Sequence, residues 1–186
     1  AVVHAMRPDS TVESVIETAL KYATPEIRKE IQHGLDAAAK YSEPLDIRRE
    51  LNEIYTNKDS PYCADKRMEH YRASSIYETV TKALAVFAAT RGNVRDAVVV
   101  SVNFGRDTDC LAASAAGLAG AFSGTQTIPP QWIEKVEEGT RNNPYTNSHM
   151  TIKETAEGMY AALKNKVRRM ESYVTLMKSQ LTADAK

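Results

Sequence analysis

The chain has 186 residues, of which 42% are hydrophobic and 26% charged, and its 24 basic residues balance its 24 acidic ones. This balance argues against a basic surface for nucleic acids, and the apolar content excludes a disordered or collagen-like chain. The longest nearly apolar run, residues 111–122, is shorter than the roughly 20 residues that span a bilayer, so we expect no membrane contact. Two cysteines and the lack of a charged-then-apolar leader favour a cytoplasmic location.

Apolar residues recur at spacings of three and four along almost the whole chain, and no stretch alternates with a period of two. The sequence therefore predicts an all-α fold. The first helix covers 12–23, with Asp9 or Ser10 as its N-cap. The second helix starts with a capping threonine followed by proline and runs over 25–41. A third, more charged helix follows from residue 44.

Residues 56–73 form a polar stretch that is longer than most connections inside a domain. We interpret it as an insertion. Its aromatic and guanidinium groups have two possible roles, stacking on a purine over a pocket or solvent exposure, and they are Tyr62, Arg67, Tyr71 and Arg72. Cys63 lies in the same stretch, and no histidine or asparagine can be assigned to it as a catalytic partner.

Helical periodicity returns over 75–90, after which Gly92 ends the helix and Asn93 can cap a short helix over 94–102. A break with a glycine separates that helix from the next one, 108–122.

The helix over 108–122 is rich in small residues, with Ala113, Gly117 and Ala121 stacked on one face. Small side chains let neighbouring backbones approach closely and give little amphipathic signal, so we expect a central helix surrounded by others. A helix that starts at Pro130 and ends at Gly139 follows.

The last segment, 148–186, is predicted to be one long helix. Its apolar residues are spaced by three or four, close to a heptad repeat, and are Ile152, Ala156, Met159, Leu163, Val167, Met170, Val174, Met177 and Leu181. This stripe packs either along the domain formed by residues 1–147 or against another chain, which would allow further oligomerisation.

Only residues 103–110 combine several chemically active side chains in a short stretch. Asp107 and Asp109 stand two residues apart at a predicted helix start, and Asp107 is two residues after Gly105. Oxygen ligands brought together by a tight turn suit a hard cation such as Mg²⁺. The alternative is an acidic helix start, because aspartates in the first turn stabilise any helix.

Residues 99–132 resemble the signature of the ADP-ribosylglycohydrolase family, Asn-x-Gly-Gly-Asp-x-Asp-Thr followed by small residues, Gly-Ala, glycine, Ile-Pro and tryptophan. The matching residues are Asn103, Gly105, Arg106, Asp107, Thr108, Asp109, Cys110, Ala112 to Gly120, Ala121, Gly124, Ile128, Pro129 and Trp132. Residues 1–20 and 76–84 also resemble helices of that family. The resemblance covers about residues 1–140 and implies a multi-helix bundle, of which residues 1–147 are the C-terminal half.

This resemblance implies an enzyme that binds two Mg²⁺ or Mn²⁺ ions and releases ADP-ribose from an ADP-ribosylated acceptor. Asp107 and Asp109 become metal ligands. Cys110 becomes a third, poorer ligand, because it stands where the hydroxyl of a threonine completes the metal shell in the family. The substrate would contact the residues around them, Asn103, Phe104, Gly105, Arg106 and Thr108. Arg106 replaces a glycine of the signature and would clamp a diphosphate or carboxylate, or pair with a neighbouring aspartate.

The first half of the family domain, which supplies further metal ligands, has no counterpart in these 186 residues. We therefore expect a companion polypeptide that carries this half and the general base. Glu78 is a weaker candidate for that base, and a surface acid is the simpler interpretation. Two alternatives stay open: hydrolysis of another N-ribosyl small molecule such as a nucleoside, and a non-catalytic structural or binding role.

Overall fold

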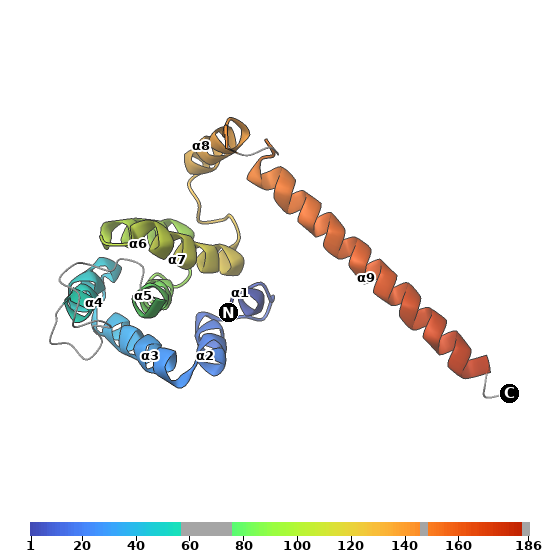
Figure 1. The fold of residues 1–186 in the computed structure, drawn as a ribbon, viewed down its shortest axis with the longest axis horizontal. Helices are drawn as coiled ribbons and strands as arrows, with labels where there is room; N and C mark the ends of the chain where they lie inside the picture. The colour runs from blue at the N-terminus through green and yellow to red at the C-terminus, as the bar shows by residue number, and fades with distance from the viewer. Residues whose placement is uncertain (57–75, 146–148, 184–186) are drawn as a thin grey trace. The chain divides into compact units, whose positions relative to one another are not determined.

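The computed structural model describes residues 1–56, 76–145 and 149–183. Every regular element in these ranges is helical, which confirms the all-α prediction. The chain divides into two units, unit 1 (Ala1–Ile128) and unit 2 (Pro129–Lys186), whose helices are labelled in Figure 1. The predicted boundary at 147/148 stays a prediction. The insertion predicted at 56–73 lies almost entirely outside the described residues, as does Cys63.

Unit 1 consists of seven α-helices and one 3₁₀ turn in its described part. They are α1 (Val2–Ala5), α2 (Val12–Tyr22), α3 (Pro25–Lys40), η1 (Pro44–Asp46), α4 (Ile47–Thr56), α5 (Ile76–Ala89), α6 (Val94–Asn103) and α7 (Thr108–Ser123). Unit 2 contains α8 (Pro130–Arg141) and α9 (Ile152–Ala183).

Side-chain caps fix several of these helix starts. Thr24 caps α3 and Asn93 caps α6, as predicted. The prediction that Asp9 or Ser10 caps α2 is wrong, because the cap is Thr11. Its hydroxyl accepts a hydrogen bond from the backbone N–H of Ser14 at 3.1 Å, and the Ser14 hydroxyl accepts one from the Thr11 N–H at 2.9 Å. This reciprocal pair satisfies two amide groups, which a single cap does not.

The helix enclosed by others in unit 1 is α5. It packs against α2, α3, α6 and α7, and Figure 1 shows it between α3 and the α6–α7 pair. Its residues are buried on every side from Thr81 to Phe87. Close contact with α3 depends on Gly34, where an added Cβ would lie 2.6 Å from the Thr81 methyl group.

The prediction of a central, surrounded helix over 108–122 is therefore wrong. One face of α7 is buried, through Leu111, Ala115, Leu118 and Ala119. The opposite face is open: Ala113 and Gly117 are exposed, and a Cβ added at Gly117 or Gly120 would meet no atom within 4 Å. The low amphipathic signal came from small residues on an uncovered face, and small residues do not reveal whether a face is buried.

In unit 2, α8 continues to Arg141 rather than ending at Gly139. The predicted long helix is confirmed as α9, with 32 residues. It contacts α8 within its own unit, and side chains such as Met159, Leu163 and Leu181 are exposed. Association of α9 with another chain stays a prediction.

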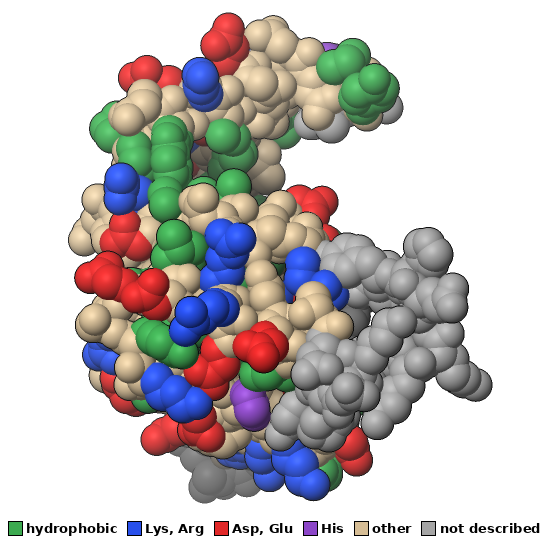
Figure 2. Space-filling model, turned by 90° about the vertical axis from the view of Figure 1, so that its left-hand side faces the viewer, with side chains coloured by type: hydrophobic (Ala, Val, Ile, Leu, Met, Phe, Trp, Pro, Cys, Tyr) green, Lys and Arg blue, Asp and Glu red, His purple; other side chains and the backbone are tan. Residues whose placement is uncertain are grey.

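The surface of the described residues matches the balanced composition. On the face shown in Figure 2, basic and acidic side chains are intermingled. Among the described helices, none combines the length and the apolar character that crossing a membrane requires.

Candidate metal centre

A sharp turn connects α6 to α7 and sets the direction of the acidic residues. Gly105 has a φ of 76° and Arg106 a φ of 64°, so two consecutive residues adopt the left-handed conformation. Glycine takes this conformation without strain, whereas for a residue with a Cβ it costs about 1–2 kcal/mol. The sequence indicated the glycine turn, but the strained arginine beside it was not foreseen.

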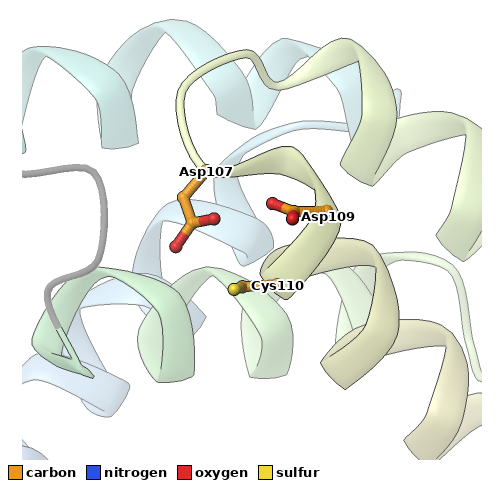
Figure 3. Close-up of side chains that lie close together, drawn as sticks. All are labelled: Asp107, Asp109 and Cys110. Carbon is orange, nitrogen blue, oxygen red and sulfur yellow. The ribbon is translucent and has the colours of Figure 1, made fainter. Parts of the chain in front are cut away.

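Asp107, Asp109 and Cys110 lie together at the end of this turn. Each offers one ligand atom, and these atoms are all within 4.8 Å of one another. Figure 3 shows Asp107 on the loop, with Asp109 and Cys110 on the first turn of α7 beside it. Asp109 and Cys110 are exposed and Asp107 is half-buried. The structure thus brings together the three predicted metal ligands.

The alternative role of these acids, as an acidic helix start, applies to Asp109 rather than to Asp107, because Asp109 lies in the first turn of α7. Asp107 occupies the N-cap position of α7, yet its side chain makes no capping hydrogen bond. The Asp107 carboxyl, followed by the backbone N–H groups of Cys110 and Asp109, holds the pKa of Asp109 below its ordinary value. The Asp109 carboxyl therefore stays ionised.

Cys110 is influenced by the same two carboxylates. Its hydrogen bond to Asp107, together with partial desolvation and the charges of Asp107 and Asp109, raises the pKa of the thiol. The thiolate is the form of cysteine that binds metals and attacks electrophiles. A thiol that keeps its proton is a weak ligand and a weak nucleophile.

Glu78 is not a surface acid, so that interpretation is wrong. Only 3% of the residue is exposed. Its two carboxylate oxygens accept hydrogen bonds from Arg106, from Nε at 2.6 Å and from Nη2 at 2.9 Å. Lys82 donates a third bond to the same carboxylate. Glu78 thus holds the turn, and its burial also argues against the role of general base.

Lys82 and Asn52 complete this arrangement, and neither was singled out from the sequence. Lys82 Nζ donates to Asn52 Oδ1 at 2.6 Å, and Asn52 Nδ2 donates to the carbonyl of Phe104 at 2.8 Å. Burial lowers the pKa of Lys82, and its bond to Glu78 opposes that shift. One feature of the sequence could have identified them. Glu78 and Lys82 lie in a helix that is apolar on every side, and charged side chains in such a buried helix must be paired.

The residues predicted to contact the substrate differ in accessibility. Asn103 and Thr108 flank the turn, Asn103 is exposed, and its amide donates to the Val99 carbonyl at 2.8 Å. The Phe104 side chain is 0% exposed, so its predicted substrate contact is wrong. Its ring faces the Lys82 ammonium group at 5.3 Å. Arg106 pairs with Glu78, a partner that the predictions did not include.

Comparisons with known proteins add an independent line of evidence. The family model described as ADP-ribosylglycohydrolase matches residues 1–168. The chain is 41% identical over 64 residues to ADP-ribosylarginine hydrolase Tri1 of Pseudomonas putida (strain GB-1), covering 34% of this chain and 17% of that protein. It is 32% identical over 78 residues to ADP-ribosylarginine hydrolase Tri1 of Serratia proteamaculans (strain 568), covering 41% of this chain and 21% of that protein. No solved structure matches the chain.

Proposed function

Because the chain belongs to the ADP-ribosylglycohydrolase family, we propose that it supplies part of the metal centre of an enzyme that releases ADP-ribose from ADP-ribosylated arginine side chains. The observation that carries this proposal is the group of ligand atoms of Asp107, Asp109 and Cys110 within 4.8 Å of one another. The arginine acceptor is suggested by the names of the two relatives. Each alignment covers about a fifth of the relative's length, so the substrate of the whole enzyme is part of the proposal.

The donor set fits a divalent cation in part. Two carboxylates suit Mg²⁺ or Mn²⁺, whereas the thiol of Cys110 is too soft for a good Mg²⁺ ligand. Asp107 and Asp109 would hold the metal, and the family resemblance implies two ions. When bound, such ions supply electrostatic stabilisation and a more acidic water molecule. The chain's own contribution is to present the carboxylates of Asp107 and Asp109 at the end of a fixed turn.

A companion polypeptide is the second element of the proposal. Two carboxylates balance only half of the charge of two divalent ions, so we expect further protein ligands in addition to water molecules. The open face of α7, which includes Gly117, begins beside these acids. A companion carrying the first half of the family domain would supply the missing ligands and the general base.

The experiment that tests this proposal uses the chain in its native assembly. Affinity-tagged chain is isolated from its source, and denaturing mass spectrometry identifies the polypeptide that accompanies it. The assembly is then assayed for release of ADP-ribose from a protein carrying ADP-ribosylated arginine, with nucleosides as competing substrates. We expect hydrolysis that EDTA abolishes and Mg²⁺ or Mn²⁺ restores. An assembly that binds neither ion and leaves the substrate intact would disprove the enzymatic proposal and favour a structural role, whereas preferential cleavage of nucleosides would reassign the substrate.

Replacement of Cys110 by threonine tests the ligand set. A hydroxyl is a harder donor than a protonated thiol, so Cys110→Thr should preserve the Mg²⁺ affinity of the assembly or raise it by up to about tenfold, equivalent to about 1.4 kcal/mol. Isothermal titration with Mg²⁺ measures the change, and Cys110→Ala is the control that removes the donor altogether. A sharp loss of affinity in the threonine variant would show that the sulfur has a specific role.

A further inference from the structure

The turn before α7 is held at both of its ends by side chains from other helices. At its first end, the Phe104 carbonyl accepts a hydrogen bond from Asn52 of α4 at 2.8 Å. At its second end, Arg106 forms a two-pronged ion pair with Glu78 of α5, at 2.6 and 2.9 Å. The two attachments span the left-handed residues Gly105 and Arg106.

Lys82 joins these two attachments into one connected group. Its ammonium group donates to Glu78 and to Asn52 at the same time. The ring of Phe104 lies 5.3 Å from this ammonium group and that of Tyr55 lies 5.7 Å from it, which adds cation–π attraction. Asn52, Glu78, Lys82 and Arg106 are called the Glu78 network below. The network connects α4, α5 and the turn.

Burial makes the Glu78 network stiff. The side chains of Lys82 and Glu78 are 2% and 4% exposed, and that of Arg106 is 13% exposed. Water competes poorly for such hydrogen bonds, and a guanidinium fork fixes direction as well as distance. The left-handed backbone of Arg106 is unfavourable by itself, so it persists because the side chain is held. Because Asp107 directly follows Arg106 in the chain, the fixed backbone at Arg106 also fixes the position from which the Asp107 side chain extends.

We propose that Asn52, Glu78 and Lys82 are positioning residues, which hold the turn so that Asp107 and Asp109 converge on one cation. This inference rests on the proposed function and extends it to residues that touch neither metal nor substrate. Residues behind metal ligands that fix their orientation commonly change metal affinity by about 10- to 100-fold when replaced. The Glu78 network has the corresponding place behind the acids.

The test combines hydrogen exchange with metal binding in Asn52→Leu. Asn52 is half-buried, and this variant removes its bonds to Phe104 and Lys82 while leaving Glu78, Lys82 and Arg106 themselves unchanged. Exchange is measured by mass spectrometry on a peptide covering 104–111, which includes the N–H groups of Thr108 and Leu111 that bond to the carbonyls of Arg106 and Asp107. We expect about tenfold faster exchange there and unchanged exchange in α2.

Metal binding is measured on the same variant in its native assembly, by electron paramagnetic resonance with Mn²⁺. We expect an affinity about tenfold lower than that of the wild type. Arg106→Lys, which keeps the charge but loses the fork, should change both measurements in the same direction. The control is Glu50→Gln on the same helix, whose carboxylate is bound by Lys40 and Tyr41. This control should match the wild type.

The outcomes separate this inference from the proposed function. Two results would overturn the inference. If residues 104–111 of Asn52→Leu exchange at the wild-type rate, the network does not hold the turn. If exchange is faster but the Mn²⁺ affinity is unchanged, the acids do not depend on the network. If the wild-type assembly itself binds no Mn²⁺, the proposed function falls. The exchange measurement requires neither metal nor substrate, and it then still decides whether the network holds the turn.

Discussion

Asp109→Asn is expected to lower kcat/KM for the proposed release of ADP-ribose by at least about 100-fold. Replacing residues behind metal ligands already changes activity by up to about 100-fold, and Asp109 is proposed to bind the metal directly. An amide keeps the shape of the side chain but loses the charge that attracts a divalent cation. The Asp109 carboxylate is exposed, and burial therefore gives it no structural role. Circular dichroism should show unchanged helical content. The rates are measured on the native assembly with an ADP-ribosylated arginine substrate.

Asp96→Asn is the matched control for this prediction. Asp96 lies in the first turn of α6, as Asp109 does in α7, so both substitutions remove a negative charge near a helix N-terminus. If Asp109 only stabilised its helix, the two variants would behave alike, with small effects on stability and none on turnover. Wild-type turnover in Asp109→Asn would show that this carboxylate is not a metal ligand.

Glu78→Gln is expected to reduce the free energy of unfolding by about 3–5 kcal/mol, the usual cost of removing one partner from a buried ion pair. The amide leaves Lys82 and Arg106 without their shared counter-charge in a site where Lys82 is 2% exposed. Urea unfolding followed by circular dichroism measures the change. The exposed pair of Glu13 and Arg91, whose side chains are 60% and 68% exposed, provides the control, since Glu13→Gln should leave the free energy of unfolding nearly unchanged.

The loss in the free energy of unfolding caused by Glu78→Gln, called the deficit below, should also depend on pH. Without its carboxylate partner, the buried Lys82 ammonium favours losing its proton, so the folded-state pKa of Lys82 lies further below the ordinary value of 10.5. The cost of the unpaired charge is fully present below that folded-state pKa and decreases as the pH rises toward 10.5. Urea unfolding of both proteins between neutral and alkaline pH measures the difference. A deficit that does not change with pH would show that Lys82 keeps its proton in the variant, and a deficit below about 1 kcal/mol would show that the pair contributes little.

Local features of the sequence predicted the helices and the acid cluster well. Proline after a capping threonine located the start of α3, and Asn93 located the start of α6, because these signals act within one helical turn. The resemblance of residues 103–110 to a family signature identified Asp107, Asp109 and Cys110, and their proximity follows from their closeness in the chain.

Features that depend on distant parts of the chain were not predictable in this way. Glu78 and Lys82 are four residues apart, which is equally typical of an exposed helical ion pair. Their role depends on Arg106, 28 residues after Glu78, and on Asn52, 30 residues before Lys82. Which helix is enclosed was also misjudged, because the small side chains of α7 fit both a crowded and an uncovered face.

The open face of α7 affects how variants of this protein should be selected. An alanine at Gly117 or Gly120 would meet no atom within 4 Å, and replacing glycine inside a helix favours folding by about 1 kcal/mol. A laboratory screen for expression or heat resistance of the isolated polypeptide would therefore enrich both replacements. If this face receives the companion, the same methyl groups would be eliminated by a screen for capture of the companion polypeptide, and opposite results of the two screens would map the contact without a structure of the assembly.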